Sequence, residues 1–99
     1  MYVRTIVADL VPGRAAEAAR IFREQVVPVV REQPGYVSTA MYVNHQTHQA
    51  QTVSFWDSKE AMESTSQDTQ YMSEVTAMLQ SCLVNREYAQ WEVAHLDDA

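Results

Sequence analysis

Several side chains in the apolar stretches of the chain have the chemistry needed to hold an aromatic molecule. Arg4 is the only positive charge in the first of these stretches, and a guanidinium can stabilise an anion. Tryptophan and tyrosine can form pocket walls and donate hydrogen bonds, and an imidazole can act as a general base. We therefore expect a planar aromatic ligand. The candidate pocket residues are Arg4, Tyr42, Trp56, Tyr88, Trp91 and His95.

Each of these residues also has a purely structural interpretation. Arg4 can pair with a carboxylate such as Glu87 or Glu92 instead of binding a ligand. The tryptophans can anchor the core or an interface, since aromatic side chains dominate both settings. His95 lies near the end of the sequence, where an exposed position is the simpler expectation. The sequence leaves both interpretations open.

Other reactive residue types lack the partners that catalysis or metal binding would need. His45 and His48 have a spacing that could chelate a metal on a helix, but they lie in a polar stretch with no nearby carboxylate or thiolate. Cys82 is the only cysteine, so no intrachain disulfide can form, and we expect a buried, inert thiol. Ser64, Thr65 and Ser66 have no arrangement for nucleophilic catalysis. We therefore predict neither a metal nor a cofactor.

Composition and charge exclude several classes of protein. The 99 residues are enough for one domain, which we place at 1–99, with a thin core. Seven basic and thirteen acidic residues give a net charge of −6, which disfavours binding to nucleic acid or anionic membranes. The sequence shows neither a signal peptide nor a long apolar run, and its single cysteine suits a reducing compartment. We therefore expect a cytoplasmic protein.

The first half of the chain predicts a strand, a long helix and a hairpin. Residues 2–10 are rich in β-branched and aromatic types, as in a strand covered on both faces. Apolar residues then recur every three or four positions over 14–33, as in an amphipathic helix, and Pro28 should kink it or start a second turn. After Pro34 and Gly35, residues 36–43 and 51–56 form two strands that flank a polar loop, with Tyr36 expected on the side of Ser38 and Val37 on the side of Thr39.

The second half predicts another helix and a last strand. Asp57 and Glu60 have capping-box spacing, which places a helix start at Asp57 or Ser58. The poor helix formers of 64–70 should break this helix before it resumes with an apolar face. The final strand is predicted over 86–95, where Ala89, Trp91 and Val93 alternate with polar or tyrosine positions. The apolar face of the second helix contains Met72, Val75, Met78, Leu79 and Cys82.

The order of these elements predicts a ferredoxin-like βαββαβ fold of the α+β class. Right-handed crossovers place both helices on one face of a four-stranded antiparallel sheet. The strands are apolar or aromatic on both faces, so the second face would expose a large patch in a monomer. We therefore expect a homodimer that pairs two sheets as a dimeric α+β barrel, with a natural pocket in the space between them.

Three segments resemble the antibiotic biosynthesis monooxygenase-like family of dimeric α+β barrels. They are VPGRAAEAARIF after the first strand, VVPVVREQPGYVS before the second strand, and SFWDSKEAM at the end of the third. The resemblance covers nearly the whole chain. It implies a homodimer with an apolar pocket in each protomer, and activities such as cofactor-free oxidation of quinols or polyaromatic compounds, haem degradation or, in related branches, aldehyde processing.

Membership in the haem-degrading branch of this family can be tested by comparing individual residues. Its members carry an asparagine on the first strand, a tryptophan in the second helix and a histidine that binds the iron. The corresponding positions of this chain are Ile6, Thr65 and Val75. Without the imidazole there is no axial iron ligand, so we predict that the chain does not degrade haem.

Two classes of function remain. The resemblance favours a cofactor-independent monooxygenase that acts on a small aromatic or quinol-like substrate in an apolar pocket. The alternative is a homodimer of the same fold that binds a small apolar molecule, or serves a structural role, without catalysis. An acid–base pair in the pocket would favour the enzyme, whereas a pocket lined only by valine, methionine and aromatic rings would favour the binding protein.

Overall fold

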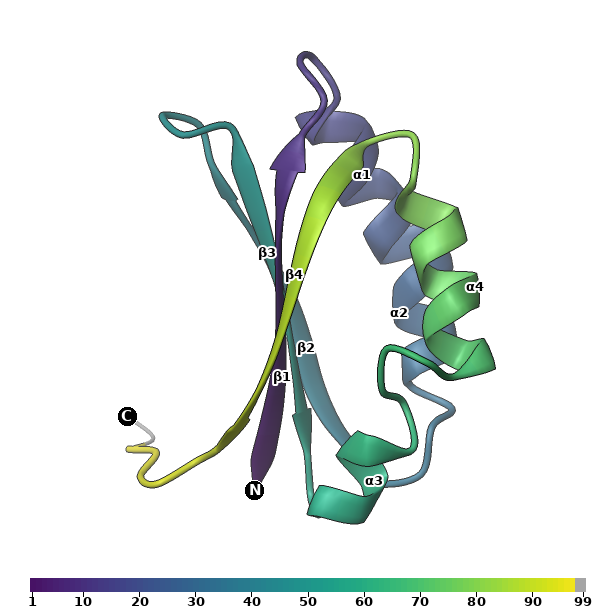
Figure 1. Ribbon diagram of the computed structural model, residues 1–99, viewed down its shortest axis with the longest axis vertical. Helices are drawn as coiled ribbons and strands as arrows, with labels where there is room; N and C mark the ends of the chain where they lie inside the picture. The colour runs from purple at the N-terminus through teal and green to yellow at the C-terminus, as the bar shows by residue number, and fades with distance from the viewer. Residues whose placement is uncertain (98–99) are drawn as a thin grey trace.

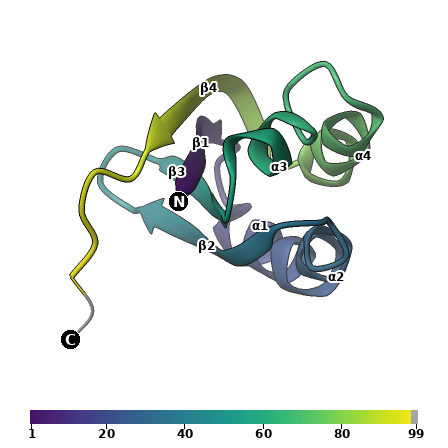
Figure 2. The ribbon, with the colours of Figure 1, turned by 90° about the horizontal axis from the view of Figure 1, so that it is seen from below.

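The computed structural model describes residues 1–97, whose strands form one antiparallel sheet in the order β2-β3-β1-β4. The helices of this part of the chain all lie against one face of the sheet (Figures 1 and 2). The strands are β1 (Tyr2–Leu10), β2 (Tyr36–Asn44), β3 (Gln49–Trp56) and β4 (Leu83–Glu92). The helical segments are α1 (Ala15–Ile21), η1 (Phe22–Val26), α2 (Val27–Val30), α3 (Lys59–Glu63) and α4 (Gln70–Leu79).

This architecture confirms the predicted ferredoxin-like fold. β1 has the predicted bounds, and β2 and β3 extend slightly further into the hairpin than 36–43 and 51–56. None of the helices in residues 1–97 is long and apolar enough to cross a membrane.

The helix after β1 changes its hydrogen-bonding pattern just before Pro28. α1 continues directly into η1, which is a π-helix, and then into the short α2 that contains this proline. Pro28 has no N–H for the carbonyl of Glu24, and a wider turn relieves the clash between the proline ring and that carbonyl. The predicted interruption is confirmed, although its π-helical form was not predicted.

Two capped helices and a tight turn form the other half of the helical layer. The Ser58 hydroxyl accepts a hydrogen bond from the Ala61 amide at 3.1 Å and starts α3 at one of the two predicted positions, although the predicted capping pair was Asp57 and Glu60. The Thr69 hydroxyl caps α4 by accepting from the Met72 amide at 3.2 Å, which confirms the break over 64–70. Gly35 has φ +80° and packs so closely against Ala61 that no side chain fits there.

The alternation of side chains separates a closed face from an open face of the sheet. On β1, Arg4, Ala8 and Leu10 are buried on the closed face beneath the helices, whereas Val3, Thr5 and Val7 belong to the open face. The closed face holds the core, which includes Ala8, Leu10, Ala18, Ile21, Phe22, Val26, Ala50, Met72, Val75, Leu79, Cys82 and Leu83. Tyr42 and Trp91 on the open face are 55% and 56% exposed.

Two β-bulges correct the predicted registers. Tyr36 pairs with Trp56 and Ser38 pairs with Phe55, so Val37 is an extra residue. As a result Tyr36 packs with Trp56 on the closed face rather than lying on the side of Ser38, and Val37 is 44% exposed. The last strand spans Leu83–Glu92 instead of 86–95, because its first residues pair with the end of β1 across a second bulge.

Candidate functional site

A small cavity lies between the closed face of the sheet and the helices. Its volume is about 40 Å³, which is room for about two or three water molecules. The sheet contributes Arg4, Ile6, Thr52, Ser54 and Tyr88, and the wall opposite comes largely from α4. The full lining is Arg4, Ile6, Phe22, Val26, Val30, Thr39, Thr52, Val53, Ser54, Tyr71, Met72, Val75, Thr76, Leu79, Leu83, Arg86 and Tyr88.

Arg4 is held rigidly at one end of this cavity. The residue is 2% exposed, and its Nη1 donates hydrogen bonds to the Thr65 carbonyl oxygen at 2.7 Å and to Thr65 Oγ1 at 2.6 Å. Its Nη2 donates to the Met62 carbonyl oxygen at 2.6 Å. Thr65 Oγ1 in turn donates to the Met62 carbonyl at 2.8 Å. These bonds connect β1 to the last turn of α3 and to the residues directly after it.

The charge of Arg4 has no acidic partner among residues 1–97. Its contacts are neutral oxygens, so the predicted pairing with Glu87 or Glu92 is wrong. Burial lowers the pKa of Arg4, because the protein interior solvates the guanidinium less well than water does. Such a group favours an anion beside it, since a bound negative charge would offset part of this desolvation.

Two tyrosines extend the polar end of the cavity. Burial raises the pKa of Tyr71 to about 12, although the nearby charge of Arg4 opposes this shift. Tyr71 is therefore a neutral phenol at physiological pH and can donate a hydrogen bond. The Tyr88 hydroxyl lies 3.3 Å from Thr76 Oγ1, which links β4 to α4 across the cavity.

A second arginine lines the cavity from β4. Arg86 Nη2 donates one long hydrogen bond, at 3.4 Å, to the Thr76 carbonyl oxygen of α4. No aspartate, glutamate or histidine lines the cavity within the described part of the chain. The acid–base pair that would have favoured an enzyme is therefore missing here, but the cavity is not purely apolar either, because cations and hydroxyl groups line it.

The structure brings together only two of the six predicted pocket residues, Arg4 and Tyr88. Trp56 is fully buried in a separate core cluster with Val30 and Met62, where its Nε1 donates to Ser54 Oγ at 3.0 Å. Tyr42 and Trp91 lie on the open face, on opposite edge strands. His95 is exposed beyond the end of β4, as its structural interpretation predicted.

Tyr71 and Arg86 were not predicted as cavity residues, and Thr65 was not predicted as a partner of Arg4. Tyr71 precedes Met72 on α4, where the apolar stripe alone does not identify a lining residue. Ile6 and Val75, at positions where haem-degrading relatives carry their asparagine and histidine, do line the cavity. Thr65, the third residue of that comparison, does not line the cavity but accepts hydrogen bonds from Arg4.

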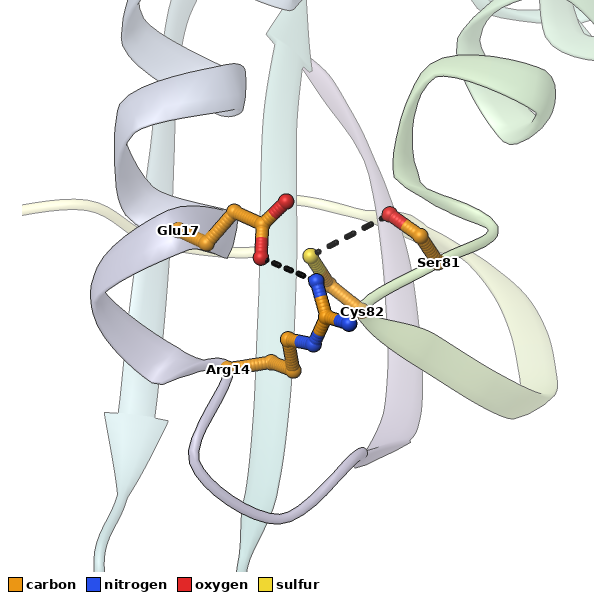
Figure 3. A network of polar contacts seen from close by, with 4 residues as sticks. All are labelled: Arg14, Glu17, Ser81 and Cys82. Carbon is orange, nitrogen blue, oxygen red and sulfur yellow. Dashed lines mark hydrogen bonds and ion pairs between the residues drawn. The ribbon is translucent and has the colours of Figure 1, made fainter.

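The other candidate reactive groups lie elsewhere. Cys82 is buried, and Ser81 Oγ lies 3.6 Å from its sulfur, beside an ion pair between Arg14 and Glu17 (Figure 3). This ion pair raises the pKa of Arg14, first through the hydrogen bond to Glu17. Among residues 1–97 no group of three or more potential metal ligands comes together.

Comparison with known proteins gives one family and a consistent fold. The family described as antibiotic biosynthesis monooxygenase matches residues 1–73. None of the curated protein sequences compared matches the chain.

Solved structures of low sequence identity share the fold. A Deinococcus radiodurans protein named as a candidate antibiotic biosynthesis monooxygenase aligns with a TM-score of 0.76 and 11% identity, over 100% of this chain and 98% of its own. A variant of MhuD with two manganese protoporphyrin IX molecules per active site aligns with a TM-score of 0.76 and 17% identity, over 100% of this chain and 99% of its own. PA3566 from Pseudomonas aeruginosa aligns with a TM-score of 0.64 and 21% identity, over 91% of this chain and 90% of its own.

Proposed function

Because the chain belongs to the antibiotic biosynthesis monooxygenase family, we propose that it is a cofactor-independent monooxygenase with an apolar, cationic site in each protomer of a homodimer. Its substrate is a small aromatic compound of the phenol or quinol type. The reaction takes place at the closed-face cavity beside Arg4, rather than in the space between two sheets.

The observation that carries this proposal is the charge of the cavity. The chain has a net charge of −6, yet two of its seven basic residues line the cavity and no acidic residue does so in the described part of the chain. The other basic residues include Arg14, Arg20, Arg23 and Lys59, which pair with glutamates on the helices. A cationic, partly apolar cavity in an acidic protein suits an aromatic anion.

The chemistry requires an electron-rich anion and dioxygen, the only co-reactant. In an anthrone-like substrate, a ring CH₂ group loses a proton to water or hydroxide in solution and gives a delocalised phenolate, which enters the cavity and transfers electrons to dioxygen. One oxygen atom bonds to that carbon, the carbon loses both hydrogens, and the other oxygen atom leaves as water. The substrate carbon supplies all four electrons that reduce dioxygen, so the balance needs no further reductant.

The residues at the polar end of the cavity have distinct roles in this scheme. Arg4 stabilises the phenolate electrostatically, and its hydrogen bonds to Thr65 and Met62 hold it in place before the substrate arrives. Tyr71 remains protonated and donates a hydrogen bond to the same oxygen. The apolar remainder of the lining excludes water, which strengthens both interactions.

Binding requires the cavity to enlarge, because its volume of about 40 Å³ does not hold an aromatic ring system. The wall formed by α4 includes Met72, whose unbranched side chain can change rotamer at low cost. The segment before α4 is a series of short turns rather than regular helix. We expect α4 and this segment to move outward when the substrate enters.

The homodimer is supported by the open face of the sheet. Val37, Tyr42 and Trp91 are each at least 44% exposed, and Val3, Val7, Phe55 and Ala89 extend this surface across the sheet. An apolar surface that spans four strands is costly to leave in water. A second copy of the chain that packs on this face would remove it from solvent.

One observation favours a binding protein without catalysis. Neither a carboxylate nor an imidazole lines the cavity in residues 1–97, so the substrate proton has no evident acceptor there. A ligand that keeps its proton would be bound and shielded but not converted.

Oxygen uptake with a panel of anthrones and naphthoquinols separates these functions. We expect consumption of dioxygen and incorporation of one isotope-labelled oxygen atom into the product. Arg4→Gln should slow the reaction by on the order of 100-fold or more, whereas Arg4→Lys retains part of the rate. Arg20→Gln, on the exposed surface of α1, serves as the matched control. Tight binding of the panel without oxygen uptake would leave the binding protein as the correct function.

A further inference from the structure

We propose that the substrate carries a second acidic group, and that Arg86 binds this group at the end of the cavity away from Arg4. This inference rests on the proposed aromatic-anion site, and it specifies the substrate as a bis-acidic aromatic compound, such as a phenol with a carboxylate on the opposite side of its ring system.

The first argument is the placement of the two arginines. Arg4 pairs with Gln90 of β4, and Arg86 lies four residues before Gln90 on the same strand. At about 3.3 Å per residue, the two backbone positions are about 13 Å apart along the sheet. Apolar side chains, including Ile6 and Val75, line the cavity together with them. The two cations therefore bracket an apolar region rather than share one anion.

The second argument is the β-bulge that orients Arg86. Val7 pairs with Glu87 and Asp9 pairs with Val84, so Asn85 and Arg86 together oppose Ala8. Side chains three residues apart on a regular strand face opposite sides, but the bulge turns both Leu83 and Arg86 toward the helices.

The bulge is built by a specific residue. Asn85 has φ +56°, a conformation that asparagine tolerates better than most residues, and its Nδ2 donates a hydrogen bond to Asp9 Oδ2 at 2.9 Å. The acidic group of Asp9 is thus bound to Asn85 rather than to Arg86. The local structure directs a cation into the cavity and binds the Asp9 carboxylate of the neighbouring strand to Asn85.

The third argument is the unused hydrogen-bonding capacity of Arg86. A guanidinium has five N–H donors. Within the described residues, Arg86 makes one protein hydrogen bond, at 3.4 Å, and no ion pair. Arg4 instead makes three short bonds that fix its position. Arg86 can therefore adjust to a carboxylate and bind it with two parallel hydrogen bonds.

Calorimetric titration with three stable probes tests this inference. 2-Naphthol offers only a phenol, 6-hydroxy-2-naphthoate adds a carboxylate at the far end, and 3-hydroxy-2-naphthoate places the carboxylate next to the phenol. We expect 6-hydroxy-2-naphthoate to bind on the order of tenfold tighter than 2-naphthol, which is the effect of one charge-assisted pair. The 3-hydroxy isomer should lack most of this gain.

Variants of Arg86 assign the gain to that residue. Arg86→Gln should abolish the preference for 6-hydroxy-2-naphthoate, and Arg86→Lys should retain part of it. Arg23→Gln, an exposed arginine of η1, is the matched control and should retain all of it.

The outcomes separate this inference from the proposed function. If the wild-type protein binds all three probes equally, or if Arg86→Gln keeps the preference for 6-hydroxy-2-naphthoate, the inference of a second acidic group on the substrate is wrong. A loss of 2-naphthol binding in Arg4→Gln would still support the phenol site in that case. If none of the probes binds to wild type, the proposed site fails and this inference fails with it.

Discussion

The two faces of the sheet are built from the same four strands but differ in how far their polar and aromatic side chains are buried. The closed face buries Arg4 completely and satisfies it with oxygens from the segment around α3. The open face leaves Tyr42 and Trp91 more than half exposed, and the indole N–H of Trp91 bonds only to Thr5 Oγ1 at 3.0 Å. The closed face therefore buries a hydrogen-bonded cation within an apolar core, and the open face leaves aromatic side chains exposed to solvent.

This contrast indicates which face provides ligand specificity and which face provides association between protomers. A buried cation with fixed hydrogen bonds discriminates between ligands, because its interactions are strong at low dielectric and cost no rearrangement. An exposed aromatic surface discriminates poorly but gains free energy when any complementary apolar surface covers it. Our proposal therefore places the chemistry at the closed face and dimerisation at the open face.

The two tryptophans provide the largest test of this division. Trp56→Ala should lower the free energy of unfolding by about 3–5 kcal/mol, because a fully buried ring is replaced by a cavity. Trp91→Ala should change the stability of the monomer by less than about 0.5 kcal/mol but weaken dimerisation by about 2 kcal/mol. Urea unfolding at several protein concentrations measures both quantities. Equal, concentration-independent effects of the two substitutions would refute the division.

A charge on the open face should have the next largest effect. Val7→Lys places an ammonium at the centre of the proposed interface, where its desolvation should raise the dimer dissociation constant by at least about 100-fold. Sedimentation velocity measures the oligomeric state. Ala77→Lys, at an exposed position of α4, is the control and should leave the dimer intact. A Val7→Lys protein that remains dimeric would place the interface elsewhere.

Two threonine-to-valine substitutions sharpen the comparison further. Thr65→Val removes an acceptor from buried Arg4 and should lower the free energy of unfolding by about 1–2 kcal/mol. Thr5→Val removes the acceptor of Trp91 Nε1 on the open face and should cost less than about 0.5 kcal/mol in the monomer. Thr65→Ser, which keeps the hydroxyl, should recover most of the loss. Equal costs for both valine variants would show that burial of the hydrogen bond does not matter.

The smallest effect is a change in the alkaline titration. Burial raises the pKa of Tyr71 to about 12, so this phenol stays protonated in the folded protein at a pH where it ionises in the unfolded chain. The contribution of Tyr71 to stability is therefore constant below about pH 10 and is lost as the pH rises toward 12. Ultraviolet titration of tyrosinate should show a late step that is absent in Tyr71→Phe. Tyr42→Phe, on the open face, should retain this step. Loss of the late step in Tyr42→Phe would contradict its assignment to Tyr71.

The sequence by itself determined the order and type of the elements. The run of β-branched residues over 2–10, the helical spacing after Pro12 and the capping-box spacing of Asp57 and Glu60 are local signals, and local backbone preferences decide them. These signals predicted β1 with its observed bounds, the interruption at Pro28 and the break over 64–70. The ferredoxin-like fold followed from the order of the elements, because connection handedness leaves few alternatives.

Only the tertiary structure decided which residues share the cavity. Arg4 meets Thr65 across 61 positions of sequence, and no local pattern reports such a contact. The bulges at Val37 and Asn85 are single extra residues. Beyond each bulge, the side chains of the strand face the opposite side from the one that strict alternation predicts. Strict alternation therefore placed Tyr36 on the wrong face and did not indicate that Arg86 lines the cavity. Side-chain identity is local, whereas the side that each residue faces depends on pairing with a distant strand. For this reason the sequence could predict a cation and aromatic rings in the strands but could not predict which of them would share one cavity.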